Sequence, residues 1–261
     1  MPFHLAAMAV NAGVNDANVD MPAVADTILG IRNNHFILTE QYNLLYAFVH
    51  GASLLRARFN IPTLNAIARP QIWPIERSAT IPDDPKGLDL RDMPLAIPTN
   101  EEIAIEESGN LGAANEREAA FIWLGDGGWN RNQPRGQYQM IVRFTATIVV
   151  SANAWSADVA IVFSETLRGG FYDVLGAWVV GASDLAFRLI FPRVAFQGSR
   201  QLRPGGLCQE SVGNTPHVIN DEMGLWGTFH SFEQPTLQVF ALTAGATAIE
   251  GRMLLSYRGP G

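Results

Sequence analysis

Residues 137–196 constrain the fold more than any other part of the sequence, because apolar residues recur there at every second position. Side chains two residues apart lie on one face of a β-strand. The first alternating run consists of Tyr138, Met140, Val142, Phe144, Ala146, Ile148 and Val150. Shorter runs of the same period follow at 159–163, 172–174 and 185–191, separated by Gly, Asp, Ser or Pro. The tract therefore predicts several β-strands.

The second face of this tract is not wholly polar. Ile141 and Val149 stand among threonines, and further apolar surface follows at Trp178, Val180 and Ile190. An antiparallel sheet with one solvated face shows a cleaner alternation of apolar and polar residues. We therefore expect the outer face to be covered, either by a helix of the same chain or by another copy.

Residues 1–51 predict an N-terminal arm with one or two short helices. The first twenty residues lack a clear period, and helical spacing follows Pro22 in the residues Val24, Ile28 and Ile31. Thr39 can cap a second helix and Gly51 can end it. Its apolar stripe consists of Tyr42, Leu45, Tyr46 and Val49. We expect this helix to pack on a sheet.

Residues 52–261 predict a single jelly-roll or β-sandwich domain in an all-β protein. Prolines recur throughout 62–98, which favours an extended wrap with short or edge strands. Four glutamates within 101–107 surround Ile103 and Ile105, as in a strand whose polar edge faces solvent. With the strands near the C-terminus we expect roughly eight to ten antiparallel strands and no internal repeat.

The composition is low in charge for a domain of this size. Charged residues make up 16% of the 261 residues, against roughly 25% in an ordinary soluble domain. Interface cores are depleted in charge, so other copies could cover much of the surface. A large core with neutral polar residues outside explains the composition equally well. Lys86 is the one lysine, and the resulting arginine bias fits either interfaces or a GC-rich genome.

Several functional classes are disfavoured by charge and cysteine usage. A net charge of −7 argues against a protein whose main task is binding nucleic acid. Cys208 is the one cysteine, which excludes an intrachain disulfide and predicts a buried, inert thiol. No apolar run reaches the roughly 18 to 20 residues that span a bilayer.

No catalytic or cofactor-binding signature is present in the sequence. Neither G-x-S-x-G nor G-x-G-x-x-G occurs. His217, Glu222 and His230 lie near one another without a known metal-binding spacing. We therefore expect no catalysis, no cofactor and no metal, with a cupin-like metalloenzyme as a remote alternative. Paired carboxylates of a glycosidase need no local motif. A carbohydrate-binding module or carbohydrate-active enzyme remains the main alternative, suggested by Trp129, Trp155, Trp178 and Trp226.

Three segments, 52–62, 68–75 and 249–257, mark an order of arm, proline-rich wrap and final strand. This order resembles the coat proteins of tailless icosahedral viruses and phages. The resemblance implies a structural capsid subunit that assembles with copies of itself, as pentamers or hexamers, into a closed shell. It also implies assembly in the host cytoplasm, presence in the virion, contact with further coat proteins, and a packaged genome or inner membrane.

Aromatic and arginine side chains are the most frequent anchors of protein interfaces. We therefore expect subunit contacts at seven residues: Tyr42, Tyr46, Arg56, Arg58, Trp73, Trp129 and Trp226.

Overall fold

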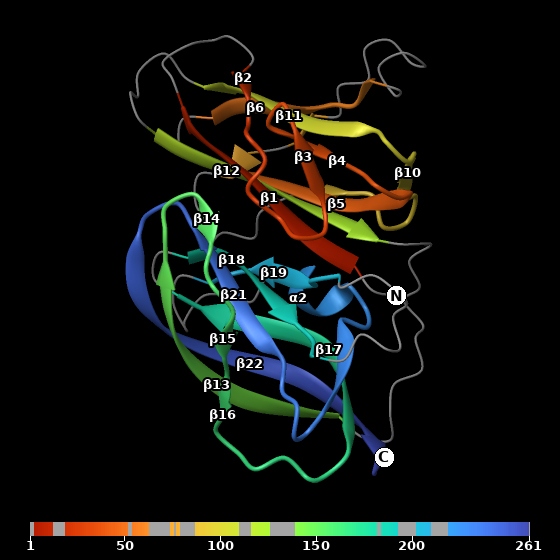
Figure 1. Ribbon diagram of the computed structural model, residues 1–261, viewed down its shortest axis with the longest axis vertical. Helices are drawn as coiled ribbons and strands as arrows, with labels where there is room; N and C mark the ends of the chain where they lie inside the picture. The colour runs from red at the N-terminus through yellow and green to blue at the C-terminus, as the bar shows by residue number, and fades with distance from the viewer. Residues whose placement is uncertain are drawn as a thin grey trace. The chain divides into compact units, whose positions relative to one another are not determined.

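The computed structural model confirms an all-β protein built mainly from antiparallel sheets (Figure 1). It describes residues 3–12, 19–51, 54–62, 74–75, 77–78, 87–109, 116–125, 139–181, 184–192, 202–209 and 219–260. The chain forms two compact units. The N-terminal unit is Ala6–Trp129, and the C-terminal unit comprises Met1–Leu5 and Asn130–Gly261.

The C-terminal unit contains two five-stranded sheets. The first has the order β16-β13-β22-β17-β20. Its strands are β13 (Gln139–Val150), β16 (Val162–Phe163), β17 (Phe171–Val180), β20 (Gly227–His230) and β22 (Gly245–Gly259). The second has the order β14-β21-β18-β19, with β15 also paired to β21. Its strands are β14 (Ala154–Trp155), β15 (Val159–Ala160), β18 (Asp184–Ile190), β19 (Gly205–Leu207) and β21 (Thr236–Ala241), and a short helix α2 (Ile219–Glu222) follows β19.

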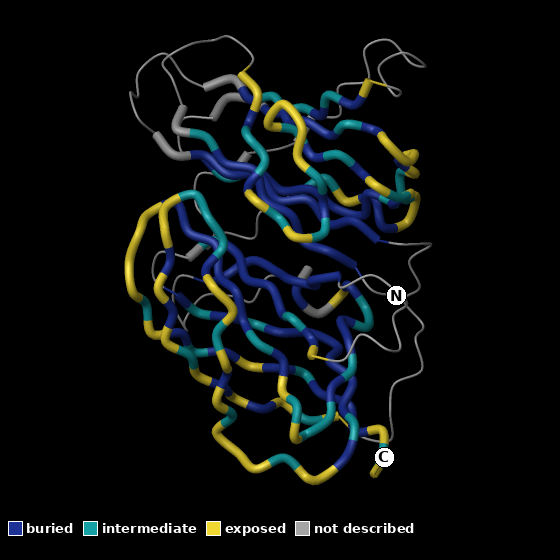
Figure 2. Tube along the Cα trace, viewed as in Figure 1, coloured by how far each residue is buried: buried dark blue, intermediate teal, exposed yellow. Residues whose placement is uncertain are grey.

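The alternation in the sequence becomes the two faces of β13. From Val142 to Val150 the even-numbered side chains are buried or half-buried and the odd-numbered ones are exposed, as Figure 2 shows along the strand. The whole strand pairs antiparallel with β22, from Gln139 opposite Ser256 to Val150 opposite Gly245. The predicted strands of residues 137–196 are therefore confirmed.

Aromatic side chains hold the C-terminal unit together. The Phe163 and Phe229 rings stack 6.1 Å apart although β16 and β20 are opposite edges of the first sheet, so this sheet curls strongly. Trp226 lies between Phe187 on the second sheet, at 5.8 Å, and Phe3, at 5.5 Å. Such ring pairs contribute about 0.5–1.5 kcal/mol each beyond the area that they bury.

The N-terminal unit contains two further sheets. The first has the order β1-β12-β5-β10, with β8 and β9 also paired to β5. Its strands are β1 (Phe3–Ala12), β5 (Tyr42–His50), β8 (Arg77–Ser78), β9 (Leu88–Asp89), β10 (Leu95–Ile97) and β12 (Glu116–Gly125). The second has the order β3-β4-β11-β6-β7, with β2 paired to β11. Its strands are β2 (Val19–Asp20), β3 (Gly30–Arg32), β4 (His35–Ile37), β6 (Leu54–Asn60), β7 (Pro74–Ile75) and β11 (Glu102–Gly109).

The two units share one strand order. Each unit has more than eight strands, so the edge strand β16 and the hairpin of β3 and β4 are set aside here, and β14 with β15, and β8 with β9 and β10, each count as one position. When the eight positions are numbered along the chain, the first sheet of each unit has the order one, eight, three, six, and the second has the order two, seven, four, five. In the C-terminal unit β13 is position one and β22 is position eight; in the N-terminal unit these positions are β1 and β12.

The predicted helix with the stripe from Tyr42 to Val49 is wrong. These residues form β5, which pairs with β12 through the aromatic contacts Tyr46–Trp123 and Phe48–Phe121. Apolar residues occupy nearly every position of β5, and both of its faces are buried. A strand buried on both faces reads as a continuous apolar run, which also contains helical spacings.

The predicted helical arm is also wrong. The first residues form β1, whose side chains Phe3, Leu5 and Met8 are buried. After Pro22 the chain forms the hairpin of β3 and β4 instead of a helix, and its turn places Asn33 and Asn34 at φ 51° and 67°. Asparagine tolerates this left-handed conformation better than most residues, so it favours a tight hairpin.

The division into units differs from the expected arm of residues 1–51 and single domain of residues 52–261. The structure divides the chain after Trp129, and each unit has its own pair of sheets. Described parts of the proline-rich wrap form the short strands β7 to β10. Cys208 is buried, as predicted.

Gly251 on β22 lies directly beneath the Phe144 ring. A Cβ atom at this position would lie 2.1 Å from Phe144 Cζ, whereas one at Gly245 on the same strand would meet nothing within 4 Å. We expect Gly251→Ala to lower the free energy of unfolding by about 1–3 kcal/mol through overpacking. Gly245→Ala is the matched control and should leave stability unchanged or slightly raised. Thermal and denaturant unfolding of both variants measures the difference, and equal stability would contradict the packing described here.

Candidate assembly surface

The outer face of the sheet β16-β13-β22-β17 carries exposed aliphatic side chains. Ile141 and Val149 on β13 are 60% and 72% exposed, and Val162 on β16 is 64% exposed. On β22, Leu254 lies opposite Ile141 and Ala246 lies opposite Val149. Single exposed aliphatic residues are ordinary, but several on one sheet face form a surface that another protein can bury. We call this face the aliphatic outer face.

A charge pair lies at the centre of the aliphatic outer face. Arg143 on β13 pairs with Glu250 on β22, and their side chains are 62% and 39% exposed. An exposed pair of this kind contributes roughly 0–1 kcal/mol to stability. Fixed opposite charges within an apolar surface are features that can orient a partner.

Strand β17 continues this surface with larger apolar side chains. Trp178 lies opposite Arg252 and Val180 lies opposite Glu250, and both apolar side chains are half-buried. The helix that was expected to cover the face does not exist, because its residues form β5. Within the described residues, Ile141 and Val149 therefore stay exposed on this chain.

The residues predicted as subunit contacts are scattered. Tyr42, Tyr46 and Trp226 are buried within the chain. The Tyr46 hydroxyl accepts a hydrogen bond from the Gly87 N–H at 2.9 Å, so its polar end is used inside the fold. Trp73, Trp129 and the side chain of Arg56 lie outside the described residues. Arg58 pairs with Glu106 across β6 and β11 at 2.6 Å.

A polar network covers the outer face of the second sheet in the N-terminal unit. Arg32 Nε donates to Glu102 Oε1 at 2.7 Å. His35 lies between two carboxylates, with Nε2 3.0 Å from Asp20 Oδ2 and Nδ1 3.4 Å from Glu102 Oε2. The hydrogen bond from Arg32, followed by that from His35, lowers the pKa of Glu102. This network links β2, β3, β4 and β11.

Two carboxyl groups are buried inside the same unit. Glu107 on β11 is 1% exposed and Glu118 on β12 is 0% exposed. Burial raises the pKa of Glu107, and its interaction with the Glu118 carboxyl lowers it by a smaller amount. The raised pKa favours the protonated form of Glu107, because a neutral carboxyl group is less costly to bury than a carboxylate. The two carboxyl groups come from strands of different sheets.

The sequence interpretation missed this pair by placing Glu107 on a solvated edge. The strand expected within residues 101–107 is confirmed from Glu102 onward as part of β11, and Glu102 and Glu106 do carry the polar outer face. Glu107, however, has the same parity as Ile103 and Ile105, which are buried. The odd number that Glu107 shares with these two isoleucines was therefore the sequence signal that its side chain lies on the buried face of the strand.

The described part of the chain contains no site for the metal chemistry that the sequence offered as an alternative. His217 lies outside it, and no cluster of three or more His, Cys, Asp or Glu side chains within it could hold a metal ion. None of the described helices has the length and apolar character needed to cross a membrane. No family model, curated protein or solved structure matches the chain.

The raised pKa of Glu107 predicts a pH-dependent stability of the N-terminal unit. Because the folded-state pKa of Glu107 lies above the unfolded value of 4.5, its protonated form stabilises the fold below that value, and this contribution is lost as pH rises through the folded pKa. We expect the unfolding temperature to fall over this window. Glu107→Gln keeps a donor toward Glu118 without the titration and should flatten the dependence.

Glu106→Gln is the control for this experiment, because Glu106 is the adjacent residue and pairs with Arg58 on the outer face. Thermal unfolding followed from acid to mildly alkaline pH should show the same slope for Glu106→Gln as for the wild type. An unchanged slope in Glu107→Gln would contradict the raised pKa of Glu107.

Proposed function

We propose that this chain is a structural coat subunit that assembles with copies of itself into a closed shell. The observation that carries the proposal is the aliphatic outer face, with Ile141, Val149 and Val162 more than half exposed on one sheet. Burying such side chains contributes about 1.5–3 kcal/mol each. A second copy of the chain is the partner most consistent with a surface that is low in charge, since 16% of all residues are charged.

The strand order supports two jelly-roll units within the chain. A jelly roll consists of eight strands in two sheets, and viral capsid domains, lectins and cupins use it. Both units have sheets in the order one, eight, three, six and two, seven, four, five. A long hairpin of eight strands pairs position one with eight, two with seven, three with six and four with five. Folding this hairpin over gives the two sheet orders. The fold alone does not decide the function.

The number of copies in a ring remains a prediction from the sequence. Heterologous contacts between copies close into a ring when the rotation between neighbours closes. We expect pentamers or hexamers of the chain within the shell.

The carbohydrate-binding alternative was suggested by four tryptophans, and two of them are covered within the chain. Trp226 is buried between Phe3 and Phe187. Trp155 is half-buried, with the Arg188 guanidinium 4.1 Å from its ring centroid. Sugar recognition uses an exposed aromatic ring, and a ring covered in this way is not available to a sugar.

Substitutions on the aliphatic outer face test the proposal. We expect the wild-type chain to form pentamers or hexamers and larger particles, and the double variant Ile141→Asp, Val149→Asp to stay small because burying the new carboxylates is costly. Its unfolding temperature should change little, since exposed substitutions alter stability by about 0.5 kcal/mol or less. Light scattering after size exclusion and electron microscopy measure both species.

Ala160→Asp is the control, because it adds the same charge at an exposed position of β15 on the other sheet. It should assemble like the wild type. A wild-type chain that stays monomeric at high concentration over a range of salt would overturn the proposal, as would normal particles from the double variant.

A further inference from the structure

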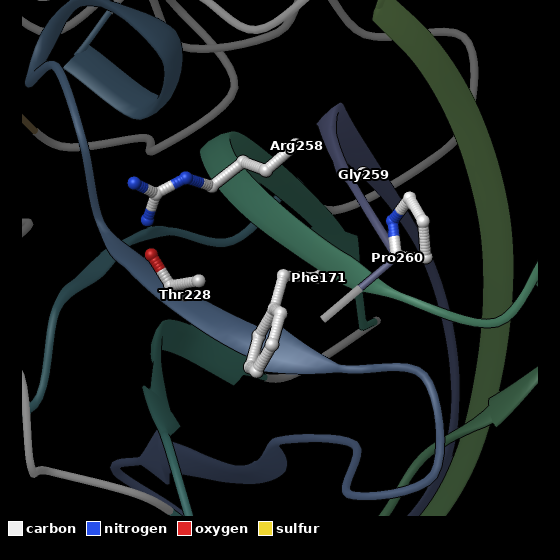
Figure 3. Close-up of a pocket in the computed structure, with 5 residues that line it drawn as sticks. All are labelled: Phe171, Thr228, Arg258, Gly259 and Pro260. Atoms are coloured by element: carbon white, nitrogen blue, oxygen red, sulfur yellow. The ribbon is translucent and has the colours of Figure 1, made fainter.

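A pocket of about 260 Å³ lies where β17 begins and β22 ends in the C-terminal unit. Its walls are Phe171, Thr228, Arg258, Gly259 and Pro260 (Figure 3). The backbone of this corner is closely packed. Phe171 lies opposite Gly259, and a Cβ atom on the preceding Gly170 would lie 2.4 Å from the Gly259 carbonyl oxygen. The pocket is therefore held by strand pairing and does not depend on a loop.

The pocket has a polar side and an apolar side. Figure 3 shows the Arg258 guanidinium and the Thr228 hydroxyl together on one side, and the rings of Phe171 and Pro260 on the other. A ligand that fills both sides must carry an anionic or hydrogen-accepting group next to an apolar group.

The charge of Arg258 is only partly compensated. Its side chain is 55% exposed, and Nη1 lies 3.6 Å from Asp173 Oδ1, which is longer than a hydrogen bond. Asp173 Oδ1 instead accepts a hydrogen bond from Thr228 Oγ1 at 2.6 Å. Arg258 thus keeps N–H donors that can form a forked pair with a carboxylate, the strongest hydrogen-bonding arrangement for arginine.

The size of the pocket limits the ligand. Pockets for small-molecule ligands usually measure about 300–1,000 Å³, so one amino-acid residue fits here better than a cofactor. The last residue of a polypeptide carries both groups when its side chain is apolar, because it ends in a free carboxylate. We propose that the pocket binds the apolar C-terminal residue of a partner protein, with its carboxylate on Arg258 and its side chain on Phe171.

An exposed aromatic side chain next to the pocket extends this site. The Phe171 ring contacts His230 at 5.0 Å, and His230 contacts Phe232 at 5.1 Å between ring centroids. Phe232 is 86% exposed, the highest exposure among the large hydrophobic side chains described. The Phe232 ring can cover the residue that precedes the C-terminal residue of the bound partner. Partner chains with two apolar residues at their end therefore fit best.

Fluorescence polarisation with a labelled peptide tests this site on the full-length chain. The probe is fluorescein-Gly-Ser-Gly-Ala-Phe with a free C-terminal carboxylate, and its matched control is the same peptide as a C-terminal amide. We expect saturable binding of the free acid and at least about tenfold weaker binding of the amide. Arg258→Gln should weaken binding of the free acid about tenfold, equivalent to about 1.4 kcal/mol.

Arg252→Gln is the matched protein control, because Arg252 is an exposed arginine on the same strand, opposite Arg143. It should bind the free acid like the wild type, and Arg258→Lys should bind with intermediate affinity because it keeps the charge without the fork. Phe232→Ala should reduce affinity about threefold, or roughly 0.7 kcal/mol. Equal affinity for acid and amide, or no saturable binding up to about 1 mM, would overturn the proposal. These measurements do not depend on whether the chain forms shells.

Discussion

The antiparallel pairing of β13 with β22 is the interaction on which the C-terminal unit depends. It joins twelve residue pairs, from Gln139 and Ser256 to Val150 and Gly245, and it brings the end of the chain beside a strand more than 100 residues earlier. A shift of one residue would turn Phe144 outward and Ile141 inward, so the buried face fixes the register. The curl of the sheet, the aromatic core and the aliphatic outer face all follow from this register.

The two units use one strand order for different surface chemistry. In the N-terminal unit the outer face of the second sheet is tied by ion pairs, among them Arg32–Glu102 and Arg58–Glu106. In the C-terminal unit the outer face of the first sheet carries aliphatic residues together with Arg252 and the pair Arg143–Glu250. The two outer faces therefore differ in polarity.

Sequence reasoning succeeded where one face of a strand is buried and the other is exposed. Alternation identified β13 and the apolar residues Ile141 and Val149 on its outer face, which became the candidate site. It failed for β5, because a strand buried on both faces has no alternation. Of the contact residues chosen by type, Tyr42 and Trp226 lie in the core of the chain, because aromatic side chains serve cores as well as interfaces.

The sequence by itself determined the all-β class, the strands of residues 137–196 and the mixed character of their outer face, because these depend on local period and residue type. Only the tertiary structure decided the duplication of the strand order, the burial of Glu107 and Glu118 within one unit, and the pocket at Arg258. Each of these depends on which distant strands become neighbours. The local alternation of apolar residues indicates the face of the strand on which a side chain lies. The neighbours of that side chain are set by strand pairing across long sequence separations, which no local pattern specifies.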